Sequence, residues 1–484
     1  MGMPNDEPGV RRQGRGRRLV VWILVLALLG SLLANGVLGG VAWWSYQGWR
    51  QEQDRAIRQE IELQQQVRQL QRDLEDCGES TNGSGDSGDV VLALDPVDAQ
   101  MMDTVEEQVV ELRELEPLDP VERAVIDRDG LYEKVLEDAF TPEEAQAYGR
   151  VLVAFDMIDP DLDMYDLLIR LYTEQIAGFY DSEVEQIYVV AEDSPAGEME
   201  RLTYAHEYTH ALQDQHHDLE AMGLSEEGED LYDSEYLSGV QALVEGDATL
   251  LQQQFLMAYY TAEEIAVLLE EMETIDTTVF DSAPKILREQ LEFPYMYGWV
   301  FVQDLYDEGG WEAVDAAYAS PPISTEQIIH PDRYRAGDAP QLVLLSPLTD
   351  TLGVGWRQVD EDIAGEFFLQ FYLAQQIPID EAEDAAEGWG GDRFAVHHRE
   401  SDGALVMALH LVWDTPADAE AFVDAYVAYA DGRFGHQADV ADGARLCWEG
   451  DADTICMTWG PADATVVLGP DQAIVDAVLE TVEE

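Results

Sequence analysis

The chain has 484 residues, too many for one ordinary hydrophobic core, so two or more folded units are expected. Hydrophobic residues make up 46% of it, which excludes a mostly disordered protein. The net charge of −74 excludes nucleic acid and anionic lipid as partners of the folded part. Because acidic residues are spread along the whole chain and lysine is rare, the composition favours a halophilic protein whose self-repulsion is screened by molar salt.

The first 46 residues predict a membrane anchor. A basic tail, residues 1–18, precedes an uncharged apolar run at 19–46, which exceeds the roughly 20 residues needed to cross a bilayer. The run ends in Trp43, Trp44 and Tyr46, aromatics typical of a membrane interface. The alternative is a cleaved secretory signal, but such signals have an apolar core of only about 7–15 residues. We therefore expect a single-pass anchor with a cytoplasmic N-terminus and an extracellular remainder.

Residues 47–77 predict a helical stalk, and residues 78–89, rich in Gly, Ser and Asp, predict a flexible linker. Apolar residues in the stalk recur at the a/d spacing of a coiled coil: Leu63, Val67, Leu70, Leu74 and Cys77. Two interpretations stay open. One is a parallel homodimer that Cys77 cross-links, and the other is a single amphipathic helix.

Residues 90–385 predict a mostly helical domain with a small sheet. Residues 186–190 have the composition of a strand, and long helices are expected around 203–212 and from about 234 to 260.

Residues 386–484 predict a separate small α+β domain, which makes the whole chain α+β. Strands are expected at 393–398, 403–413 and 464–469, and helices at 416–430 and from about 471. Cys447 and Cys456 flank a predicted hairpin turn, where they either form a disulfide or remain two buried thiols.

The stretch 203–212, TYAHEYTHAL, places two histidines one helical turn apart. Both imidazoles of His206 and His210 can then reach one zinc ion. Glu207 sits beside them, off the ligand positions, where it can take a proton from a water that the metal activates. The alternative is a polar helix face that binds nothing.

A catalytic zinc ion needs a third protein ligand and an open position. The ligand spacing of a metzincin is absent after His210. Glu245, on the next long helix and in an apolar setting, is the candidate third ligand for a single Zn²⁺. The alternative for Glu245 is an ordinary surface glutamate.

Four stretches together resemble the gluzincin metallopeptidases, and in particular their peptidase MA-like group. They occur in the expected order at 178–190, 205–219, 242–249 and 323–334, within about half of the chain. The resemblance implies that His206, His210 and Glu245 bind zinc and that Glu207 is the general base.

The resemblance also implies a substrate-binding edge strand, which Gln186, Ile187 and Tyr188 match. Many gluzincins carry an acidic residue four positions after the third ligand, where this chain has Thr249. Asp214 or Asp247 would have to orient the ligands instead.

A donor for the developing oxyanion is also needed, and His330, Tyr297 and Tyr295 are the candidates.

The expected function is a membrane-anchored, extracellular zinc metallopeptidase that hydrolyses peptide or protein substrates. The alternative is a catalytically inactive cell-surface binding or scaffold protein that keeps the peptidase fold. A zinc hydrolase acting on a non-peptide amide is a third possibility.

Overall fold

The computed structural model describes residues 91–92, 96–128, 130–132, 141–182, 184–190, 197–225, 228, 231–441 and 445–483. The expected basic tail, anchor, stalk with Cys77, and linker lie outside these ranges. Within them, no helix combines the length and the apolar character that crossing a membrane requires.

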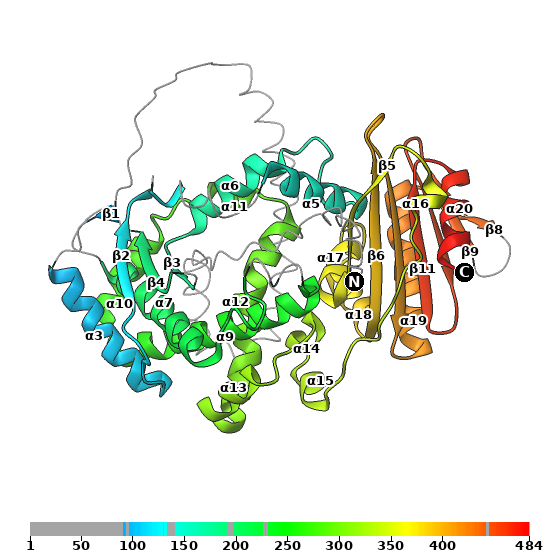
Figure 1. The fold of residues 1–484 in the computed structure, drawn as a ribbon. Coiled ribbons are helices and arrows are strands. Elements are labelled where there is room, and N and C mark those ends of the chain that lie inside the picture. The colour runs from blue at the N-terminus through cyan, green and yellow to red at the C-terminus, as the bar shows by residue number, and fades with distance from the viewer. Residues whose placement is uncertain are drawn as a thin grey trace, which may run out of the picture.

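The fold is α+β, as the sequence predicted, with two sheets at opposite ends of a helical body (Figure 1). The helices of this body, in chain order, are α3 (Pro96–Arg113), α5 (Pro142–Ala154), α6 (Met164–Gln175), α7 (Glu198–His217), α9 (Ser234–Tyr259), α10 (Ala262–Met272), α11 (Thr278–Ser282), α12 (Lys285–Gly309), α13 (Trp311–Tyr318), α14 (Thr325–Ile329) and α15 (Pro331–Ala336).

The first sheet has the strand order β1-β2-β4-β3. Its strands are β1 (Val91–Leu92), β2 (Glu122–Ile126), β3 (Gly178–Asp181) and β4 (Gln186–Val190). β4 has the predicted bounds, but it pairs with β2 on one side and β3 on the other. The prediction that β4 is an edge strand is therefore wrong, because β2, which the sequence did not reveal, occupies its second edge. The edge strand beside α7 is β3.

The helices α9 and α12 cross in close contact through two glycines. A Cβ at Gly246 would lie 2.2 Å from the carbonyl oxygen of Gly298, and a Cβ at Gly298 would lie 2.1 Å from that of Ala242. Only glycine permits such a close backbone approach. The crossing therefore fixes α9 against α12 within one turn of Glu245.

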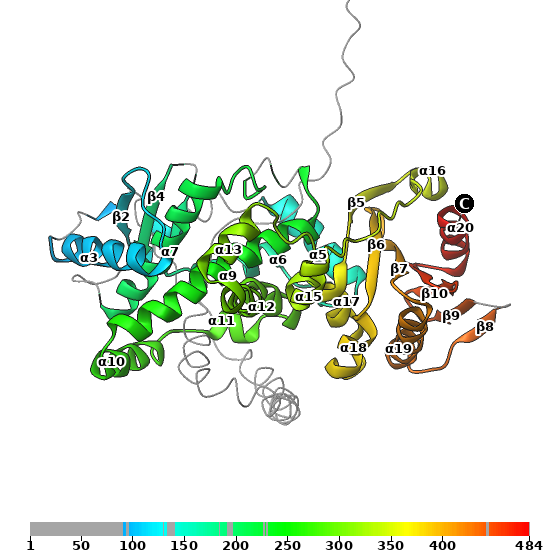
Figure 2. The ribbon, with the colours of Figure 1, turned by 90° about the horizontal axis from the view of Figure 1, so that it is seen from below.

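The second sheet has seven strands in the order β5-β6-β7-β11-β10-β9-β8. The elements of this part are α16 (Thr349–Leu352), β5 (Trp356–Asp362), α17 (Gly365–Leu373), α18 (Ile379–Ala386), β6 (Trp389–Arg399), β7 (Ala404–Trp413), α19 (Pro416–Phe434), β8 (Asp439–Ala441), β9 (Arg445–Glu449), β10 (Thr454–Trp459), β11 (Asp463–Gly469) and α20 (Gln472–Val482). α19 and α20 cover opposite faces of the sheet (Figure 2).

This sheet is not a separate tail. It includes β5, which lies before the predicted boundary at residue 386. It also shares one hydrophobic core with the helical body. Phe155, at the end of α5, packs edge-to-face on Phe368, Tyr372 and Phe394. The two parts are therefore held together by buried aromatic contacts.

Candidate metal centre

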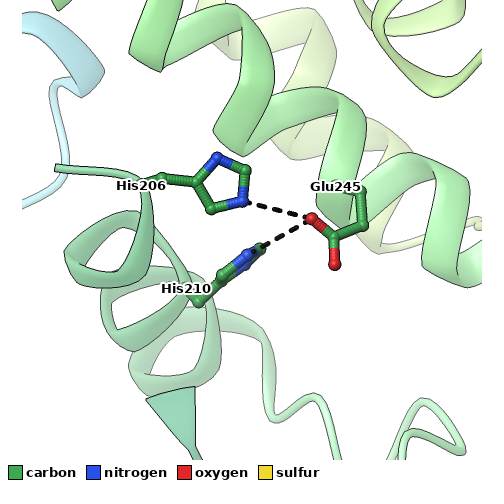
Figure 3. Close-up of side chains that lie close together, drawn as sticks. All are labelled: His206, His210 and Glu245. Atoms are coloured by element: carbon green, nitrogen blue, oxygen red, sulfur yellow. Dashed lines mark hydrogen bonds and ion pairs between the residues drawn. The ribbon is translucent and has the colours of Figure 1, made fainter. Parts of the chain in front are cut away.

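Three buried side chains from two neighbouring helices meet at one point (Figure 3). His206 and His210 extend from α7, and Glu245 extends from α9. Oε2 of Glu245 lies 3.2 Å from Nε2 of His206 and 3.5 Å from Nε2 of His210. The structure thus brings together the three residues that the sequence predicted as metal ligands.

The spacing and chemistry of these atoms fit a zinc ion. Tetrahedral zinc with bonds of about 2.0–2.1 Å holds its ligand atoms about 3.3 Å apart, close to the 3.2 and 3.5 Å found here. Nε2 of His210 and Oε1 of Glu245 are buried without a hydrogen-bond partner among the described residues. Because buried polar atoms need partners, a shared dication would satisfy both.

The electrostatics of the cluster favour a positive charge at its centre. Burial lowers the pKa of His206 to about 4, so this imidazole is neutral at pH 7, the form that binds metal. Burial also acts to lower the pKa of His210, but the Glu245 carboxylate outweighs it and raises that pKa to about 9. Burial would favour a protonated Glu245, yet the two histidines lower its pKa to about 2. A buried carboxylate therefore attracts a cation to this point.

Glu207 lies beside the cluster on α7 and is fully buried. Burial, with a smaller contribution from Glu245, raises the pKa of its carboxyl to about 8, although His210 acts in the opposite direction. Neither of its oxygens makes a side-chain hydrogen bond among the described residues, and the backbone amide of Tyr180 on β3 acts to lower its pKa. A Cβ at Gly178 of β3 would lie 3.6 Å from Cγ of Glu207, so the edge strand passes next to this side chain. A carboxyl with a pKa near neutrality suits proton transfer.

Of the two tyrosines considered, Tyr295 lies next to the cluster, with its ring centroid 6.3 Å from that of His206. Tyr297 instead packs against Phe293 and Phe367. Of the two tyrosines, Tyr295 is therefore the one whose ring lies beside the cluster. The two side chains point in different directions because an advance of two residues along α12 rotates the side chain by about 200° around the helix axis.

A cavity of about 210 Å³ has Tyr295 in its wall, but none of the three cluster residues and not Glu207. Its walls come from α5, α6, α9, α12, β5, α17 and β6, and they include Tyr295 and Gln241. Gln241 lies one turn before Glu245 on α9. The cavity lies between the helical body and the start of the second sheet.

His330 does not join the cluster. Its Nε2 lies 2.8 Å from Oε1 of Glu366 on α17. Gly365, next to Glu366, lies against Glu235, because a Cβ at Gly365 would touch the carboxylate of Glu235. Glu235 lies ten residues before Glu245 on α9, which is about 15 Å along the helix. The structure therefore places His330 in a contact between α14, α15 and α17, and it does not support the predicted role as an oxyanion donor.

The two aspartates predicted to orient the ligands have other partners. Asp214 accepts a hydrogen bond from the hydroxyl of Tyr180, at 3.0 Å, and so ties α7 to β3. Asp247 accepts hydrogen bonds from Arg113 and from Tyr318.

The residue that contacts a ligand imidazole is Gln213, 2.8 Å from Nδ1 of His210. This contact was not predicted from the sequence, although the spacing of three residues on a helix indicates that the two side chains are neighbours.

Gln186, Ile187 and Tyr188 lie on β4, whose backbone is paired on both sides. They are therefore not available to pair with a substrate.

Cys447 and Cys456 lie directly opposite each other on β9 and β10 and form a disulfide.

Comparison with family models matched residues 351–479 to a domain of unknown function, DUF8575. This match covers the second sheet with β5 and ends within α20, and it does not include the metal cluster. No curated protein and no solved structure matched the chain.

Proposed function

We propose that this chain is a gluzincin-type zinc metallopeptidase, anchored by residues 19–46 and acting outside the cell. The observation that carries the proposal is the meeting of His206, His210 and Glu245 at zinc spacing, with Glu207 buried beside them. Two imidazoles and one carboxylate are a ligand set of catalytic zinc, which keeps a further position open.

Each side chain has a distinct role in this proposal. Zinc, when bound, polarises a carbonyl and lowers the pKa of a water molecule to about 7. Glu207 would take the proton of the attacking water and would deliver it to the nitrogen of the amine that leaves when the peptide bond breaks. Its raised pKa suits the second step, in which the protonated carboxyl acts as the acid. Tyr295, beside His206, is the donor that stabilises the oxyanion.

The backbone of β3 is positioned to bind an extended peptide. The amide of Val190 donates to the carbonyl of Ala177, at 2.9 Å. Because hydrogen-bonded pairs alternate along an antiparallel ladder, Phe179 pairs with Tyr188, and the backbone groups of Gly178 and Tyr180 face the open edge. We infer that substrate pairs with these two residues, next to Glu207.

The test compares Glu207→Gln with the wild-type chain on a mixed library of fluorogenic peptides in high salt. The substitution removes the general base and leaves the three ligands in place. Stoichiometric zinc should remain, while cleavage falls about 10²–10⁴-fold. Glu220→Gln is the matched control, because Glu220 is exposed just beyond the end of α7.

The outcomes separate the two functions. Undiminished cleavage by Glu207→Gln would show that the assigned mechanism is wrong. A wild-type chain that binds zinc but cleaves no peptide would favour the alternative of an inactive cell-surface binding protein.

A further inference from the structure

We infer that Gln213 is a positioning residue, which fixes the tautomer of His210 and links the two ligand-bearing helices. The inference rests on the proposed zinc site. It concerns a contact inside the protein and not the zinc ligands themselves.

The orientation of the Gln213 side chain follows from its two contacts. Its Nε2 donates to the backbone carbonyl of Val244, at 3.1 Å, and its Oε1 lies 2.8 Å from Nδ1 of His210. The reverse orientation would set the amide oxygen against the carbonyl oxygen of Val244, where neither atom can donate. Because Oε1 is only an acceptor, Nδ1 of His210 must carry the hydrogen.

The tautomer of His210 then determines what its other nitrogen can do. With the hydrogen on Nδ1, Nε2 of the neutral ring presents a lone pair. Nε2 faces Oε2 of Glu245 at 3.5 Å and has no hydrogen-bond partner among the described residues. A metal ion bound between these two atoms would take the lone pair of Nε2. Gln213 thus presents His210 in the form that a metal requires.

The same side chain reaches the second ligand helix. Val244 immediately precedes Glu245 on α9, so the amide of Gln213 joins the backbone of α9 to the imidazole on α7. Gln213 is fully buried, so water does not compete for these bonds. His206 differs, because its Nδ1 has no partner among the described residues. The two imidazoles are therefore held unequally, and His210 is the one fixed in orientation.

The first measurement is the zinc affinity of the full-length chain, obtained by competition with a chromogenic chelator. Gln213→Met keeps the length of the side chain and removes both hydrogen bonds. It should weaken zinc binding about 10–100-fold, as loss of a partner behind a metal-binding histidine does. Gln213→Glu keeps an acceptor for Nδ1 and should bind zinc more tightly than Gln213→Met. If Gln213→Met does not fold, Gln213→Glu is compared with the wild-type chain, whose affinity it should approach.

Gln215→Met is the matched control. Gln215 lies two residues further along α7 and also bonds to backbone groups, those of Leu118 and Asp119. It is remote from the ligands, so its loss should leave zinc affinity within about twofold of the wild-type value.

The second measurement reads the tautomer directly, by ¹⁵N NMR of the zinc-loaded chain with labelled histidine. His210 should be protonated at Nδ1 and bound through Nε2 in the wild-type protein.

Binding of zinc to Gln213→Met with wild-type affinity, or a His210 that carries its hydrogen on Nε2, would overturn the inference. A wild-type chain without zinc affinity would instead overturn the proposed function.

Discussion

At the scale of single residues, the sequence predicted the side chains whose geometry follows from helical spacing. His206, His210 and Glu207 lie on one helix, so their relation is local and can be read from the chain. The predicted position of Glu245 next to the two histidines agrees with the structure. The roles of His330 and Tyr297 could not be predicted, because they depend on which distant element each side chain meets. His330 is held by Glu366, and Tyr297 by aromatic packing.

Because Tyr295 lies beside His206 and Tyr297 does not, the same substitution at the two positions gives a test and its control. Tyr295→Phe removes only the hydroxyl of the ring beside His206. If this hydroxyl stabilises the oxyanion, kcat should fall about 10²–10³-fold while the zinc content is unchanged.

Tyr297→Phe makes the same chemical change in a ring that packs on Phe293 and Phe367. Its kcat should stay within a few fold of the wild-type value. Equal effects of the two substitutions on kcat would refute the assignment.

At the scale of helices and strands, the predicted elements of the C-terminal part lie close to the observed ones. β7 and α19 match because their sequences show clear periodicity and clear end signals, such as the capping Thr415 followed by Pro416. β2 and β5 were not identified as strands. Both carry charged residues within short segments, and they are strands because they pair with distant neighbours.

The glycine crossing of α9 and α12 predicts a strong effect from one methyl group. In Gly298→Ala the new Cβ would lie 2.1 Å from the carbonyl oxygen of Ala242, so the helices must separate. Overpacking of this kind costs about 1–3 kcal/mol. We expect a lower Tm and weaker zinc binding, because Ala242 is only three residues from Glu245.

Gly432→Ala provides the comparison for this prediction. For a Cβ at this position on α19, the two nearest atoms would both belong to the side chain of Gln376, at 3.3 and 3.5 Å. Alanine in a helix is favoured over glycine by about 0.5–1 kcal/mol. Thermal denaturation should show no loss of stability, and a Gly298→Ala chain as stable as this control would contradict the close crossing.

At the scale of the whole molecule, the sequence predicted an α+β chain with a division near residue 386. The structure instead includes β5 in the second sheet and joins that sheet to the helical body through one core. Composition could not reveal this, because an aromatic contact such as Phe155 with Phe394 involves positions far apart in the chain.

The net charge of −74 predicts that stability depends strongly on salt. Repulsion between like charges acts over about 10 Å at 0.1 M salt and only about 3 Å at 1 M. The Tm of the full chain should therefore rise between 0.1 M and 2 M sodium chloride. A neutral osmolyte at equal osmolality should raise it less, because it does not screen charge. A Tm that is flat or falls with salt would contradict the halophilic interpretation.

The most direct test of the zinc site is anomalous diffraction at the zinc absorption edge from crystals of the zinc-loaded chain. The account predicts one strong peak, about 2.0–2.1 Å from Nε2 of His206, from Nε2 of His210 and from a carboxylate oxygen of Glu245. Glu245→Gln, prepared in the same way, should show a weaker peak or none. The absence of a peak at this position in the wild-type crystals, or a peak with Glu245 turned away from it, would contradict the account.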